Sequence, residues 1–201
     1  TATAKAMVYY SPLFFLLQFL LVVNFIAATI KHQYLKRGKW GLMLTHFAFI
    51  IILLGALTSF LFGEEGILHL REGETSNQIA VRTSDNTTFH TLPFSVELKK
   101  FTLTRYPGSA SPSSYESEVI VHVDGEDREE RIFMNNVLDV KGYRFFQASY
   151  DQDEHGTILS VNRDVAGRNI TYTGYLLLVI GLILCLVGKD SRFMRQSRRL
   201  K

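Results

Sequence analysis

Cysteine is almost absent from this 201-residue chain, which contains only Cys185. A single cysteine excludes an internal disulfide framework, a CxxC redox pair and a CxxCH site for covalent haem attachment. The chain is therefore neither a thiol oxidoreductase nor itself a c-type cytochrome. Phosphate-binding glycine loops, Ser/His/Asp groupings and paired carboxylates are missing from its sequence as well, so we expect no catalytic soluble domain.

Charge is missing from three long apolar runs, residues 9–30, 41–62 and 171–188. A helix rises about 1.5 Å per residue and needs roughly 20 apolar residues to cross ~30 Å of hydrocarbon. Each run is therefore predicted to be a transmembrane helix. Gly174 and Gly181 fall on one side of the third run, which predicts a close approach to another helix.

Basic and acidic residues are unevenly divided among the segments between these runs. Residues 31–40 carry four Lys/Arg and no acid, residues 189–201 carry six Lys/Arg and one acid, and residues 63–170 carry eleven Lys/Arg and eighteen Asp/Glu. Because short basic segments stay in the cytoplasm, the connector 31–40 and the tail 189–201 are predicted to be cytoplasmic and residues 63–170 extracytoplasmic. The tail is interpreted as a topology signal that contacts the lipid bilayer, and not as a nucleic-acid site.

Residues 63–170 read as one all-β domain. Val119, Val121 and Val123 share one face of a strand, and residues 143–150 form an aromatic-rich strand. Asp124-Gly125 predicts a tight hairpin turn, and the alternation after Leu98 suggests a slip of register. A β-sandwich or a partly closed barrel is expected, with a flexible loop at residues 107–114.

The predicted fold class is thus a membrane protein with transmembrane α-helices and one all-β extracytoplasmic domain. The three spans place residue 1 on the same side as that domain. Residues 1–6 do not resemble a signal peptide, so we expect one more span upstream of this sequence, with a processed product as the alternative.

Histidine occurs once within the three apolar runs, at position 46. An ionisable side chain inside a membrane segment marks a functional site by default. From the residues alone, an interhelical hydrogen bond and ligation of a bound group explain His46 equally well. The histidines of the β-domain lack metal-ligand spacing and are interpreted as surface residues; they are His69, His90, His122 and His155.

Motifs in three parts of the chain resemble the ResB/CcsB family of System II cytochrome c biogenesis. The first comprises HFAFIIILLGA at residues 46–56 and FGEEGILHLREGE at residues 62–74. The second is GYRFFQASYD at residues 142–151, and the third is VNRDVAG at residues 161–167, which leads into the last apolar run. The resemblance is weakest over residues 77–114.

This resemblance implies a component of a holocytochrome c synthase, or haem lyase, that works with CcsA/ResC as a separate subunit or within a fused CcsBA chain. Such proteins move haem b across the membrane and attach it to the CxxCH motif of apocytochrome c, supported by thiol-reducing partners. The family's axial haem ligand corresponds to His46, and its second ligand lies on the CcsA part. The chain is then a non-catalytic or co-catalytic part of the complex, in the bacterial inner membrane or, in a plastid homologue, the thylakoid membrane.

The chemistry of haem agrees with this assignment. Neutral imidazole is a common ligand of haem iron. No second histidine lies in the apolar runs, so another polypeptide or another part of the same one must complete a six-coordinate site. Three phenylalanines are candidates to line a groove for the ring, namely Phe47, Phe49 and Phe60.

The basic connector allows two interpretations. Lys36, Arg37 and Lys39 could attract haem propionates, although the topology signal explains them without haem. The chain as a whole also has an alternative function. It could be a membrane-tethered scaffold or assembly module that binds no haem, in which His46 is a packing residue.

Overall fold

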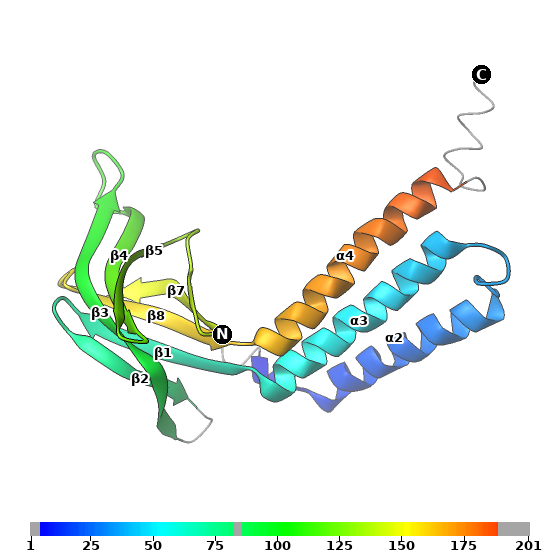
Figure 1. Ribbon diagram of the computed structural model, residues 1–201, viewed down its shortest axis with the longest axis horizontal. Coiled ribbons are helices and arrows are strands. Elements are labelled where there is room, and N and C mark those ends of the chain that lie inside the picture. The colour runs from blue at the N-terminus through cyan, green and yellow to red at the C-terminus, as the bar shows by residue number, and fades with distance from the viewer. Residues whose placement is uncertain (1–4, 83–85, 189–201) are drawn as a thin grey trace. The chain divides into compact units, whose positions relative to one another are not determined.

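A computed structural model describes residues 5–82 and 86–188, which form two compact units. Gly63–Asp164 is the β-domain, and the helices before and after it make up the other unit (Figure 1). The predicted basic tail, residues 189–201, lies outside the described residues.

Three helices are long and apolar enough to cross a membrane, as predicted: α2 (Pro12–Lys31), α3 (Trp40–Phe62) and α4 (Val165–Val187). The helix α2 starts at Pro12 and not at residue 9, after a short π-helix, η1 (Lys5–Tyr9). Ser11 sets this start, because its side-chain oxygen accepts a hydrogen bond from the Phe14 N–H at 3.2 Å. Proline suits the first turn, where its missing N–H removes no helical hydrogen bond.

The helix α4 starts at Val165, whereas the apolar run that predicted it starts at residue 171. Arg168 and Asn169 interrupt the apolar pattern in its first turns, but polar side chains do not prevent helical hydrogen bonding. The β-domain therefore ends at Asp164 and not at residue 170.

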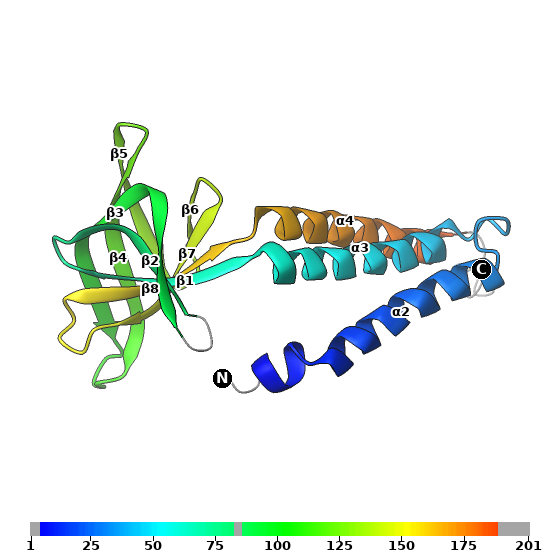
Figure 2. The same ribbon diagram turned by 90° about the horizontal axis from the view of Figure 1, so that it is seen from below.

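The helices α3 and α4 are antiparallel and lie in close contact along their lengths (Figure 2). A Cβ atom added at Gly41 would lie 2.6 Å from the Cys185 nitrogen, and one at Gly174 would lie 3.1 Å from the Ile52 nitrogen. The predicted close approach at Gly174 is thus confirmed, with α3 as the partner. All buried residues of the two helices are small: Gly41, Thr45, Ala48 and Gly55 in α3, and Gly167, Gly174 and Gly181 in α4.

The β-domain is one eight-stranded antiparallel sheet. Around the sheet the order is β5-β4-β3-β2-β1-β8-β7-β6, so all consecutive strands pair except β5 and β6, which form the two edges. The strands are β1 (Glu64–Arg71), β2 (Thr75–Arg82), β3 (Thr87–Arg105), β4 (Pro112–Val123), β5 (Glu126–Phe133), β6 (Leu138–Val140), β7 (Tyr143–Tyr150) and β8 (Gly156–Arg163).

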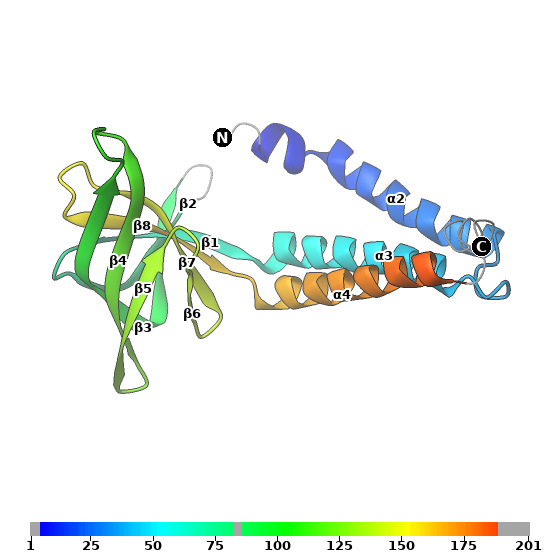
Figure 3. The same cartoon turned by 90° about the horizontal axis from the view of Figure 1, so that it is seen from above.

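This meander curls into a nearly closed barrel, which selects the barrel over the sandwich (Figure 3). The first strand pairs with the last, with Glu64 opposite Arg163. The edge strands β5 and β6 approach each other, and the connection between them begins with a tight turn in which Phe133 and Asn136 form a bridge. Because the start of β1 pairs with the end of β8, the chain enters and leaves the β-domain at neighbouring positions of the sheet.

Local features of the barrel follow the sequence closely. The pairing of β3 with β4 shifts register between Leu98 and Lys100, at the predicted slip. Asp124 and Gly125 both have positive φ, of 54° and 82°, as a tight hairpin turn requires. The loop expected at residues 107–114 is shorter than predicted, because β4 already begins at Pro112.

The barrel interior is filled by large apolar side chains and one polar group. Ser117 and Thr157 are fully buried and joined by a 2.9 Å hydrogen bond, and Gln147 bonds to both of them. These residues belong to β4, β7 and β8, which lie on opposite sides of the gap in the sheet. The buried hydrogen bonds therefore link the two ends of the curled sheet.

Candidate functional site

His46 lies in the second turn of α3, half-buried against α2. Its Nδ1 is 3.3 Å from the hydroxyl oxygen of Thr29, near the end of α2. The ring of Phe25 lies 5.1 Å from the imidazole, and the ring of Tyr34 meets it edge-on at 5.3 Å. Two helices and the connector between them thus surround one imidazole.

The connector holds Tyr34 against this imidazole through a compact pair of turns. The Tyr34 N–H donates to the Thr29 carbonyl, and the Tyr34 carbonyl accepts from the Lys39 N–H at 2.9 Å. Gln33 and Gly38 take positive φ, of 48° and 65°, which allows the chain to reverse direction there. The predicted connector is therefore an ordered cap on the end of the α2–α3 hairpin.

The other ring nitrogen of His46, Nε2, has no hydrogen bond within the described residues. Over the same residues, no fully buried side-chain nitrogen or oxygen lacks a partner. Nε2 is then at least partly exposed on the helical unit. The interhelical hydrogen bond expected for His46 is present. It engages Nδ1 and leaves Nε2 to bind a ligand.

The aromatic residues near His46 differ from those predicted. Phe49 belongs to the cluster, because its ring stacks on Phe25 at 5.4 Å. Phe60 does not, since it contacts Tyr10 and Phe15 at the other end of α3. Phe47 is 54% exposed and makes no ring contact within the described residues. The prediction of one groove lined by all three phenylalanines is wrong.

Sequence reasoning missed Thr29, Phe25 and Tyr34, although the first two left a signal. In an antiparallel helical hairpin, residues equally distant from the connector lie opposite each other. Thr29 and His46 are equally distant from residues 37–38, and Phe25 and Phe49 are equally distant from residue 37. Tyr34 left no such signal, because its position depends on the turns of the connector.

The chemistry of His46 fits one axial position on haem iron. A neutral imidazole with an accessible Nε2 is a suitable donor, and flanking aromatic rings give it an apolar surrounding. Across the three helices it is the one histidine, because His32 lies at the C-cap of α2 and is exposed. Lys36, Arg37 and Lys39 are also exposed on the connector.

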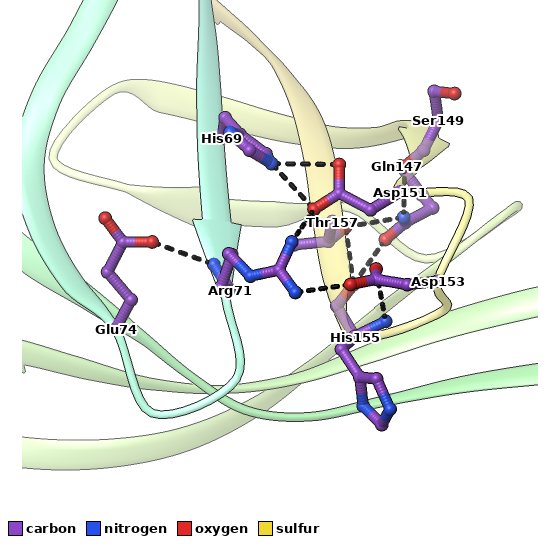
Figure 4. Close-up of polar contacts among 10 residues, drawn as sticks. His69, Arg71, Glu74, Gln147, Ser149, Asp151, Asp153, His155 and Thr157 are labelled. Carbon is purple, nitrogen blue, oxygen red and sulfur yellow. Dashed lines mark hydrogen bonds and ion pairs between the residues drawn. The ribbon is translucent and has the colours of Figure 1, made fainter.

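The β-domain has its own polar cluster, at the turns that follow β1 and β7 (Figure 4). Asp151 accepts hydrogen bonds from Arg71 at 3.2 Å and contacts Nε2 of His69 at 2.9 Å. Arg71 also pairs with Asp153 and lowers the pKa of that carboxyl. Close by, His155 contacts Glu72, whose pKa is lowered mainly by the Phe101 N–H.

This cluster joins turns far apart in sequence and is largely exposed. The side chains of His69, Arg71 and His155 are at least half exposed. Within the described residues, no three His, Cys, Asp or Glu side chains converge as a metal site would require. We therefore assign this cluster a structural role, in which its hydrogen bonds and ion pairs connect the turns that follow β1 and β7.

Comparison with known proteins finds relatives in cytochrome c biogenesis and a family for this chain. Protein NrfI of Wolinella succinogenes is 53% identical over 113 residues, which make up 55% of this chain and 12% of that protein. The chain thus spans about an eighth of the length of that relative. A solved structure titled Cytochrome c Heme Lyase CcmF matches with a TM-score of 0.42 and 14% identity over 71% of this chain and 23% of its own. The model of the ResB-like family matches residues 31–166, and the chain is a member of that family.

Proposed function

We propose that this chain is the B component of a System II cytochrome c synthase, acting in cytochrome c biogenesis. It works with CcsA/ResC, as a separate subunit or as part of one longer protein, to move haem across the membrane and support its attachment to the CxxCH motif of apocytochrome c. Membership of the ResB-like family supports this role. The observation that carries it is the accessible Nε2 of His46 in an apolar helix.

In this proposal haem is the substrate, and His46 holds its iron from one side through Nε2. A donor outside these residues occupies the opposite position, since the spans contain no second histidine. Phe25 and Tyr34 keep water from the imidazole, and Lys36, Arg37 and Lys39 attract the propionates. The connector then faces the cytoplasm and the barrel faces outward, as the charge distribution predicts.

The barrel's part in this proposal is to support the external site and to position apocytochrome c or its thiol-reducing partners. Its described side chains offer no converging metal ligands, and Arg71, Asp151 and Asp153 of its polar cluster are engaged in ion pairs. In this proposal the catalytic groups for the attachment step lie elsewhere in the complex.

A spectrum of the complete complex tests the proposal. His46→Ala should lose co-purified haem or shift its absorption bands, because an axial ligand is removed. His32→Ala is the matched control, since His32 is the other histidine of the helical unit and is exposed. An unchanged haem spectrum in His46→Ala rejects the assigned ligand.

The alternative function is a scaffold that binds no haem. The contact between Thr29 and His46 favours this alternative, because an interhelical hydrogen bond can serve helix packing alone. Side-chain hydrogen bonds between membrane helices contribute about 0.6 kcal/mol. A purified complex that is colourless and free of iron supports the scaffold, whereas bound haem that depends on His46 supports the synthase component.

A further inference from the structure

The hydroxyl of Thr29 has a single proton, and that proton is already engaged. Its oxygen donates to the Phe25 carbonyl, one turn back in α2, over 2.8 Å. The contact from the same oxygen to Nδ1 of His46 is longer, 3.3 Å. The hydroxyl can therefore serve the imidazole only as an acceptor.

The protonation of the imidazole follows from this. If Nδ1 were bare, its lone pair would face a lone pair of the Thr29 oxygen. If Nδ1 carries the proton, it donates a hydrogen bond to that oxygen. Neutral imidazole carries one proton, so a protonated Nδ1 leaves Nε2 bare.

The same contact fixes the orientation of the ring. A 180° flip of the imidazole exchanges Nδ1 with Cδ2, which would place a carbon against the Thr29 oxygen and lose the hydrogen bond. The rings of Phe25 and Tyr34 flank the imidazole and limit other rotations. Nε2 is then both unprotonated and held toward the accessible surface.

We propose that Thr29 is a positioning residue that keeps His46 in the Nδ1–H tautomer, with Nε2 ready to coordinate iron. The proposal rests on the haem ligation proposed above. A ligating histidine commonly donates its other N–H to a fixed acceptor, which orients the ring and increases its basicity. In this chain the acceptor is the Thr29 hydroxyl on the neighbouring helix α2. The distance between α2 and α3 therefore determines the tautomer of His46.

The tautomer can be measured without haem. The full-length protein, labelled with ¹⁵N-histidine, should show a protonated Nδ1 and an unprotonated Nε2 for His46 at a pH where the ring is neutral. Thr29→Val removes the acceptor with little change in shape, and the ring should revert mainly to the Nε2–H form that free histidine favours. Thr29→Ser should restore the Nδ1–H form.

Thr58→Val is the matched control. Thr58 makes the same bond to a carbonyl one turn back, at Leu54 over 2.8 Å, and its hydroxyl has no imidazole partner. This variant should leave the nitrogen shifts of His46 unchanged. A wild-type His46 in the Nε2–H form, or a Thr29→Val protein with the wild-type tautomer, overturns the proposal.

Haem titration of the complete complex gives the second readout. Thr29→Val should weaken haem binding about 10-fold. Losing the hydrogen-bond partner of a metal-ligating histidine typically costs about 10- to 100-fold in affinity, and we expect the lower value because a hydroxyl is a weaker acceptor than a carboxylate. It should also raise the reduction potential of the bound haem, while Thr29→Ser and Thr58→Val stay near wild type. A changed tautomer with unchanged haem affinity overturns the positioning role.

The outcomes separate this inference from the proposed function. If His46→Ala keeps its haem, the proposed function fails, whatever the tautomer. If His46→Ala loses haem while Thr29→Val matches Thr58→Val in tautomer and affinity, only the role of Thr29 fails.

Discussion

The buried positions of α3 and α4 are glycine, alanine and threonine, whereas the barrel is filled by leucine, valine, isoleucine, phenylalanine and tyrosine. The difference reflects the surroundings of each region. Lipid is as apolar as leucine, so membrane helices gain little by burying large apolar side chains and instead bring their backbones close together. The barrel, which we place in water, gains about 25 cal/mol for each Å² of apolar surface that it buries. Opposite kinds of substitution should therefore disrupt the two regions.

The largest effect is expected from shortening a side chain in the barrel. Phe145 is fully buried on β7, and Phe145→Ala should reduce the free energy of unfolding of the β-domain by about 4 kcal/mol, because it leaves a cavity. Hydrogen exchange of peptides from β7 and β8 measures the loss. Phe146→Ala is the control, since Phe146 is 38% exposed and should change exchange little. Equal effects of the two variants would contradict a tightly packed barrel interior.

Lengthening a side chain should have the next largest effect, in the helices. A Cβ at Gly55 would lie 2.8 Å from the Thr171 nitrogen and 3.1 Å from the Gly167 oxygen, which belong to the backbone of α4. Gly55→Val should therefore separate α3 from α4 and destabilise the helical unit by about 3 kcal/mol. Thermal unfolding in detergent, followed by helical circular dichroism, measures this.

The neighbouring residue supplies the control for that variant. Ala56 is exposed on α3, and Ala56→Val adds similar volume away from α4. It should leave the helical melting temperature close to that of the wild type. A Gly55→Val protein as stable as Ala56→Val would show that backbone proximity does not hold these helices together.

The smallest effect concerns the pH dependence of the barrel. A hydrogen bond to Asp127, with a smaller contribution from Glu97, raises the pKa of His122 on β4 above its unfolded value of about 6.5. The stabilisation by this group is thus complete below the unfolded pKa and is lost as the pH rises through the folded pKa. Hydrogen exchange of the β4–β5 hairpin should show this decline from pH 6 upward.

Replacing the partner isolates this contribution. Asp127→Asn should flatten the decline, and added salt should weaken it in the wild type, because the Asp127 side chain is 70% exposed. If the hairpin becomes more stable as the pH rises through this range, the assigned sign is wrong.

Much of the fold was predictable because it depends on local sequence patterns. Uncharged apolar runs predicted the three helices, and alternation predicted β4, whose buried valines are Val119, Val121 and Val123. The predicted boundaries were wrong where polar or loop-type residues belong to a helix or a strand. The first turns of α4 are helical although Arg168 and Asn169 are polar, and β4 extends through Pro112 to Ser114 although these residues are typical of loops.

The candidate site was predictable only in part. His46 stood out because an imidazole in an apolar run requires a reason. The aromatic residues proposed beside it were chosen by their position in the same run, and a helix turns each of them in a different direction. Phe49 faces α2 near His46, while Phe60 meets α2 at the opposite end of α3.

The sequence by itself determined that three segments are apolar enough to span a membrane, that an acidic β-domain separates the last two, and that one imidazole lies among them. These properties depend on composition and on periodicity along the chain. Only the tertiary structure decided that the sheet curls into a barrel and that Thr29 meets Nδ1 of His46. Both depend on contacts between residues distant in sequence, and such contacts are fixed by how neighbouring elements pack.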